Sequence, residues 1–227
     1  EESGRHAELS QILQKKAEIV DDPLEKKRAY HRSAELEETV LGRLDEAIAV
    51  QHKALDVDGE DLDTLDALIR LYLAGSKWRE LLEMYARKVD LVPSADDKKR
   101  IYYQIGAVYE RELRSVERAI DTYRKVLEID PDDITALGRL DVLYTVAESW
   151  QELLTVLVHE AELSTSPDDA IAFQFRVGEV YEKRLSDVAH ALEIYREILL
   201  RDATHAPTLG ALETDRKSTR LNSSHRT

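Results

Sequence analysis

Residues 105–127 read IGAVYERELRSVERAIDTYRKVL, and residues 177–199 read VGEVYEKRLSDVAHALEIYREIL. The second stretch repeats the first after 72 residues, with the same order of small, aromatic and aliphatic positions. The small and aromatic positions that they share are Gly106 and Gly178, Tyr109 and Tyr181, Ala119 and Ala191, and Tyr123 and Tyr195. An internal repeat of this length indicates stacked structural units, and it takes precedence over any local motif.

Shorter motifs extend the 72-residue register in both directions. WRELL at Trp78 returns as WQELL at Trp150. TLDAL at Thr64 returns as ALGRL at Ala136 and as TLGAL at Thr208. About three copies therefore fill most of the chain, as expected for repeat proteins.

Each copy reads as four helices. Apolar residues recur at the i, i+3, i+4, i+7 spacing of an amphipathic helix at Val116, Ala119, Ile120, Tyr123, Val126 and Leu127. Only 8 Gly and 5 Pro leave little turn material for a β-sandwich or barrel. Short breaks between the helices predict antiparallel hairpins, two per copy. We therefore predict an all-α fold, a right-handed α-α superhelix of stacked hairpins.

Composition limits the classes of function. A net charge of −14 argues against nucleic-acid binding, which needs concentrated Lys and Arg. No apolar run approaches the ~20 residues of a membrane span. Cysteine is absent, so disulfides and thiolate chemistry are excluded. The compartment stays open, with the cytoplasm favoured over the periplasm.

No constellation of residues predicts catalysis, so we expect no enzyme, cofactor or metal site. The histidines are scattered without paired ligand spacing, and the glycines stand alone rather than in a phosphate-binding loop. Acidic clusters at residues 56–63 and 130–133 lack the spacing of calcium loops. We interpret them as carboxylates at helix N-termini, opposite the helix dipole.

The hairpins resemble tetratricopeptide repeats. That family's order of small, aromatic and proline positions is matched at Gly106, Tyr109, Ala119, Tyr123 and Pro131, with one extra residue in the turn. The next hairpin matches too, except that Ala203 stands where Pro would be. The small residues let helix backbones approach, and the aromatic rings fill the gap beside them.

The resemblance implies a scaffold that binds a protein or peptide on a concave face made by the first helix of each hairpin. The chain has no Asn before residue 215, which argues against the family's clamp for a terminal carboxylate. Tyr103 and Phe175 are the strongest candidates for apolar anchors, although both rings could instead pack against a neighbouring hairpin. The predicted partner-binding residues are Arg28, His31, Glu35, Asp66, Arg70, Arg100, Tyr103, Glu110, Arg111, Phe175 and Glu179.

Two other function classes stay open. The repeats could be a regulatory or docking segment of a larger multidomain enzyme, or a structural spacer in a bacterial cell-envelope or motility assembly. The full gene would separate them by showing a catalytic domain or an export signal. The sequence does not predict the oligomeric state.

The repeat pattern breaks at Asp215. Residues 215 and 216 should be apolar by comparison with Leu71-Tyr72 and Leu143-Tyr144, but they are Asp and Arg. The string DRKSTRLNSSHRT, residues 215–227, resembles a translated sequencing adapter. We expect a repeat array at residues 1–214, a fragment of a longer array, and a foreign or disordered tail at residues 215–227.

Overall fold

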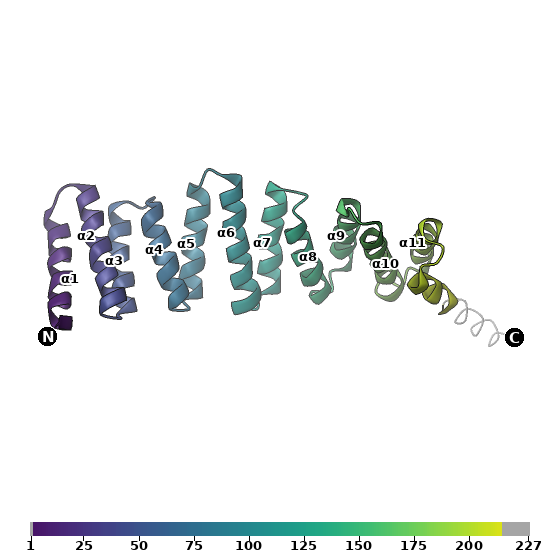
Figure 1. The fold of residues 1–227 in the computed structure, drawn as a ribbon, viewed down its shortest axis with the longest axis horizontal. Helices are drawn as coiled ribbons and strands as arrows, with labels where there is room; N and C mark the ends of the chain where they lie inside the picture. The colour runs from purple at the N-terminus through teal and green to yellow at the C-terminus, as the bar shows by residue number, and fades with distance from the viewer. Residues whose placement is uncertain (1, 215–227) are drawn as a thin grey trace. The chain divides into compact units, whose positions relative to one another are not determined.

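The structure is a computed structural model that describes residues 2–214, with side chains from residue 3 onward. The predicted tail, residues 215–227, lies outside the described part. Every regular element of residues 2–214 is helical, which confirms the predicted all-α class (Figure 1). Helix packing divides the chain into two compact units, which we call unit 1, ending at Arg114, and unit 2, beginning at Ser115.

In unit 1, each helix packs against the next one along the chain. Its α-helices are α1 (Glu2–Ile19), α2 (Pro23–Glu35), α3 (Leu44–Val57), α4 (Leu62–Ala74), α5 (Trp78–Leu91) and α6 (Ala95–Ala107). Two π-helical turns, η1 (Leu36–Val40) and η2 (Val108–Glu112), extend α2 and α6. The extent of the predicted array stays a prediction.

Unit 2 repeats the same order of antiparallel neighbours. It contains α7 (Val116–Ile129), α8 (Ile134–Val146), α9 (Trp150–Leu163), α10 (Pro167–Lys183), α11 (Val188–Arg201) and a last helix over residues 206–214. Leu65, Leu68 and Leu81 are fully buried in unit 1, and their repeat counterparts Leu137, Leu140 and Leu153 are buried in unit 2. Each such side chain contributes about 1.5–3 kcal/mol through burial.

Helix starts also keep the 72-residue register. Asp22, Ser94 and Ser166 are the N-caps of α2, α6 and α10, and each side chain accepts a hydrogen bond from a backbone N–H of the first turn. Asp61 and Asp133 cap α4 and α8 in the same way. These two carboxylates confirm that acids of both clusters sit at helix N-termini, as predicted.

The extra residue in the hairpin turn becomes a π-helical turn. The backbone N–H groups of Leu41, Leu113 and Leu185 each donate to the carbonyl five residues earlier, at 3.0 Å. This bond spans one residue more than an α-helical bond, so the turn holds the extra residue without opening the helix end. The next residue, Gly42, Arg114 or Ser186, has positive φ at 65°, 51° or 57° and redirects the chain into the following helix.

A glycine lets α10 approach α11. A Cβ built on Gly178 would lie 2.4 Å from Cε1 of Tyr195, a distance that real Cβ atoms essentially never show. Tyr195 is buried, and its hydroxyl donates to Glu182 Oε2 at 2.8 Å. This contact has the small-beside-aromatic packing that the family resemblance implied.

Candidate functional site

The predicted partner-binding residues of unit 1 divide into exposed and half-buried positions. Exposed side chains belong to Arg28 and Glu35 on α2, Asp66 and Arg70 on α4, Arg100 on α6, and Arg111 on η2. Half-buried side chains belong to His31, Tyr103 and Glu110. The neighbouring apolar positions of the same helices are buried, so these residues mark the solvent side of each first helix.

Most of the exposed charged candidates form ion pairs within unit 1. Arg70 pairs with Glu38 of η1, and Asp66 pairs with Lys88 of α5. Arg100 pairs with Asp97 one turn earlier. Glu35 Oε2 accepts from Arg32 at 2.8 Å. Exposed pairs contribute only about 0–1 kcal/mol, so a partner could replace them at little cost.

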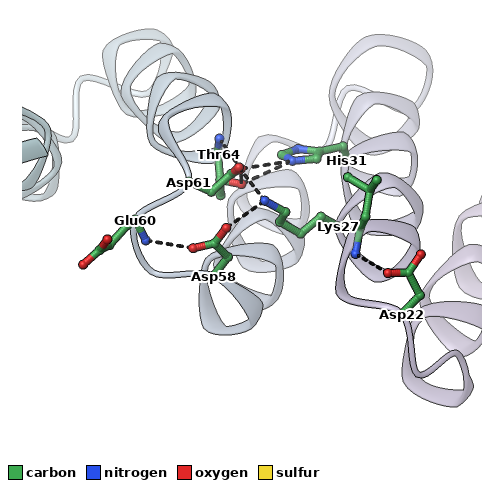
Figure 2. A network of polar contacts seen from close by, with 8 residues as sticks. Asp22, Lys27, His31, Asp58, Glu60, Asp61 and Thr64 are labelled. Atoms are coloured by element: carbon green, nitrogen blue, oxygen red, sulfur yellow. Dashed lines mark hydrogen bonds and ion pairs between the residues drawn. The ribbon is translucent and has the colours of Figure 1, made fainter. Parts of the chain in front are cut away.

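His31 belongs to a polar network that joins α2 to the turn between α3 and α4 (Figure 2). The Lys27 ammonium donates to Asp58 Oδ2 at 2.9 Å and to Asp61 Oδ1 at 2.6 Å. The His31 ring nitrogen Nε2 lies 3.2 Å from Thr64 Oγ1 and 3.7 Å from Asp61 Oδ2. These contacts hold the His31 side chain against Asp61 and Thr64 within unit 1.

The pKa shifts of the charged groups in this network agree with its geometry. Hydrogen bonds to Asp61 and Asp58 raise the pKa of Lys27. Burial opposes ionisation of Asp61, but hydrogen bonds from Lys27 and Thr64 outweigh it and lower the pKa of Asp61. The hydrogen bond from Lys27 also lowers the pKa of Asp58. These charges stabilise one another, so we interpret the network as a structural one.

Phe175 occupies the position in α10 that His31 and Tyr103 occupy in earlier repeats. Its ring centroid lies 5.6 Å from that of Tyr195 and 5.6 Å from that of His205. Phe175 is half-buried against the small core of α10, α11 and the last helix. The structure therefore gives Phe175 a packing role, and its role as a partner anchor stays a prediction. Glu179, also half-buried, pairs with Lys183.

Unit 2 contains a pocket that none of the predicted residues marked. It has a volume of about 340 Å³ and lies among α8, α9 and α10. Its wall is mainly apolar, and Glu160 and Asp169 supply the carboxylates. The lining residues are Ile134, Leu137, Glu160, Leu163, Ser164, Thr165, Asp169, Ala172 and Phe173.

Glu160 is the unusual member of this pocket, because it is an acidic residue that is only 8% exposed. Within the described residues, Glu160 Oε2 has no hydrogen-bond partner. The neighbouring Arg176 instead donates from its two terminal guanidinium nitrogens to the two oxygens of Asp141, each at 2.6 Å. Burial raises the pKa of Glu160 to about 7, Asp141 adds to the rise, and Arg176 opposes it.

The repeat register contained a signal for this pocket. Moving back 72 residues from Gly138 and Glu160 leads to Asp66 and Lys88, which form an ion pair in unit 1. In unit 2 the aspartate has become glycine and the lysine has become glutamate. A comparison of the copies for reversed or missing charges would have identified Glu160.

Residues 2–214 contain neither a cluster of candidate metal ligands nor a membrane-spanning helix. No group of three or more His, Asp or Glu side chains there could hold a metal ion. Among these same residues, no helix is long and apolar enough to cross a membrane.

The fold and the repeated packing define a helical-repeat protein. A tetratricopeptide-repeat family model matches residues 99–133, which run from α6 to the turn before α8. This match confirms the predicted resemblance to tetratricopeptide repeats within residues 99–133. No curated protein matches the sequence.

Several solved structures are similar in fold. YrrB, described as a TPR protein with an unusual peptide-binding site, is 18% identical with a TM-score of 0.43, covering 82% of this chain and 91% of that one. A MamA structure is 19% identical with a TM-score of 0.42, covering 76% and 96%. PilF of Pseudomonas aeruginosa is 13% identical with a TM-score of 0.42, covering 93% and 97%.

Proposed function

We propose that this protein is a non-enzymatic scaffold that binds a protein or peptide partner along the first helices of its hairpins. In unit 1 these helices are α2, α4 and α6, and in unit 2 they are α8 and α10. The observation that carries the proposal is the recurrence of exposed polar side chains on helices whose opposite sides are buried. Repeat proteins use such aligned surfaces for binding.

The face also offers the components that binding needs. Arg100 and Arg70 are exposed guanidinium groups, and Arg is enriched at the centre of interfaces. The pocket of unit 2 adds an apolar cavity bounded by α8 and α10. Unit 1 therefore offers charged contacts on its first helices, and unit 2 offers an apolar cavity beside its own.

A peptide selection tests the proposal. A random phage-displayed library is selected on the immobilised full chain, and enriched peptides are measured against variants by fluorescence anisotropy. We expect Arg100→Ala and Tyr103→Ala to weaken binding about tenfold, the effect of losing ~1.4 kcal/mol. Arg79→Ala is the matched control, because Arg79 begins α5, a second helix, and its side chain is 91% exposed.

Circular dichroism distinguishes binding from folding effects. The variants should keep the helical signal and the melting temperature of the parent chain. Early melting of both Arg100→Ala and Tyr103→Ala would assign these residues to the core. Selected peptides that bind equally well to both variants but lose affinity for the Arg79→Ala chain would place the binding surface on the second helices.

A further inference from the structure

The pocket of unit 2 differs from the same place in unit 1 by the loss of long and cationic side chains. In unit 1 the positions are filled by Asp66, Lys88, Asp97 and Arg100, which form two ion pairs with no net charge. The counterparts in unit 2 are Gly138, Glu160, Asp169 and Ala172. Two charged side chains have become glycine and alanine, so the space opens and holds two carboxyl groups, those of Glu160 and Asp169.

The buried side chain of Glu160 has an oxygen without a hydrogen-bond partner among the described residues. A buried charge is costly unless it is paired, and Glu160 Oε2 has no partner among the described residues. A ligand that brings a cation to Glu160 would therefore remove an existing cost as well as add a contact. Gly138 leaves room beside the carboxylate, since a Cβ there would lie 3.7 Å from Glu160 Oε1.

The shape of the pocket indicates that the cation comes on an apolar stem. Ile134, Leu137, Leu163 and Phe173 form its wall, so a methylene chain would bury its surface there. The volume of about 340 Å³ lies within the range of small-ligand pockets. A long side chain from a partner fits these two requirements.

An ammonium suits the site better than a guanidinium. A guanidinium binds best to a carboxylate that offers both oxygens to a planar fork, as Asp141 does for Arg176. Glu160 Oε2 is buried without a hydrogen-bond partner among the described residues, and a compact ammonium can pair with this single oxygen. Unit 1 also holds an ammonium at this place, where Lys88 pairs with Asp66.

We infer that the pocket formed by α8, α9 and α10 receives a lysine side chain of the partner protein. Its ammonium pairs with Glu160, and its methylene chain lies against the apolar wall. Asp169, at the exposed edge of the pocket, adds negative charge that attracts the cation. This inference rests on the proposed scaffold function and names the chemistry of the partner.

The test titrates the ¹⁵N-labelled full chain with side-chain analogues and follows amide shifts by NMR. The probes are n-butylammonium for lysine, n-propylguanidinium for arginine, and 1-butanol as the neutral isostere. We expect n-butylammonium to shift amides of the pocket lining and to bind at least about tenfold more tightly than 1-butanol. Equal affinity for these two probes, no shift at the pocket, or tighter binding of n-propylguanidinium would each overturn the inference.

Two variants and one control separate charge from cavity. Glu160→Gln should abolish the preference for n-butylammonium over 1-butanol while leaving 1-butanol binding unchanged. The double variant Gly138→Asp with Glu160→Lys rebuilds the ion pair of unit 1 and should remove binding of both probes. Glu193→Gln, an exposed change on α11, should leave both affinities as in the parent chain.

Binding should also depend on pH. The groups that face Glu160 are Asp141 on α8, and Arg176 and Asp169 on α10. A bound cation favours the carboxylate, whereas the empty site is protonated below its pKa of about 7. Affinity for n-butylammonium should therefore fall about tenfold for each pH unit below 7, and level off above it. Affinity independent of pH would contradict the assignment to Glu160.

The pocket and the scaffold proposal can fail separately. Selected peptides that bind the first helices of unit 1 but ignore Glu160→Gln and contain no required lysine would leave the scaffold standing and overturn the pocket. Binding of n-butylammonium without any peptide binding would support the pocket and contradict the scaffold function.

Discussion

The α2–α3 hairpin of unit 1 and the α10–α11 hairpin of unit 2 occupy equivalent places in the repeat but are held together by different chemistry. In unit 1, Lys27 and His31 contact the acidic turn that leads into α4. The residues at these places in unit 2 are Ile171 and Phe175, which pack in an apolar cluster with Tyr195. The opposing Asp61 corresponds to His205, which now contacts the Phe175 ring.

The closest approach of the helices differs in the same way. Ala34 in α2 corresponds to Gly178 in α10, and Gln51 in α3 corresponds to Tyr195 in α11. A larger side chain on one helix is thus matched by a smaller one on the other. The repeat preserves the helix geometry and the burial of these positions, while an ion network and an aromatic cluster serve as alternative ways to fill them.

The largest expected effect comes from breaking the aromatic packing of unit 2. Gly178→Ala should destabilise unit 2 by about 3 kcal/mol, because its Cβ would overlap the Tyr195 ring and force α10 and α11 apart. The converse change in unit 1, Ala34→Gly, should cost only about 1 kcal/mol through helix propensity. Hydrogen exchange with mass spectrometry would measure the loss of protection in each unit.

Gly210→Ala is the control for this pair. Gly210 lies in the last helix, and a Cβ there meets no atom within 4 Å. The change should leave stability equal or slightly higher. If Gly178→Ala costs no more than Gly210→Ala, close helix approach is not what holds this hairpin.

A middle-sized effect should follow from breaking the ion network of unit 1. Lys27→Met should destabilise unit 1 by on the order of 2 kcal/mol, because Asp61 keeps its burial but loses its cation. Lys16→Met is the matched control, since the pair of Lys16 and Glu25 is 3.9 Å long and more than half exposed on both sides. Urea titrations of both variants would give the comparison.

The loss of stability caused by Lys27→Met should also depend on pH. The pKa values of Asp58 and Asp61 in the folded chain lie below 3.8, the ordinary pKa of an aspartate side chain. The stabilisation by Lys27 is therefore fully present above that value and is lost as pH falls through the lowered pKa. The difference between the parent chain and Lys27→Met should shrink in that acidic range. A difference that stays constant there would assign the effect to packing of the lysine stem.

The smallest effect concerns the turns of the two hairpins. Gly42 and Ser186 share the left-handed position after the π-helical turn, with φ of 65° and 57°. Gly42→Ala should destabilise unit 1 by about 1 kcal/mol, and Ser186→Gly should stabilise unit 2 by less than that. Thermal melts followed by circular dichroism would detect opposite shifts. Shifts of the same sign would show that these turns are not equivalent.

The exposed positions of the first helices could be predicted from the sequence, whereas the pocket of unit 2 was not. The solvent positions Arg28, Asp66 and Arg70 follow from helical periodicity, and the structure exposes all three. Their intramolecular partners could not be predicted, because Glu38 and Lys88 come from other elements whose side chains meet only after the helices pack. The same limit applies to Phe175, whose burial depends on Tyr195 and His205.

Sequence patterns alone indicate an all-α repeat, the residues at which its helices begin and the positions that they bury. Such features depend on local periodicity, on caps such as Asp61, and on the 72-residue register. Helix packing, by contrast, was needed to show that the extra turn residue forms a π-helical turn and that Glu160 Oε2 is buried without a hydrogen-bond partner among the described residues. That result depends on distances between α8, α9 and α10, because a carboxylate is costly or harmless according to the groups that surround it.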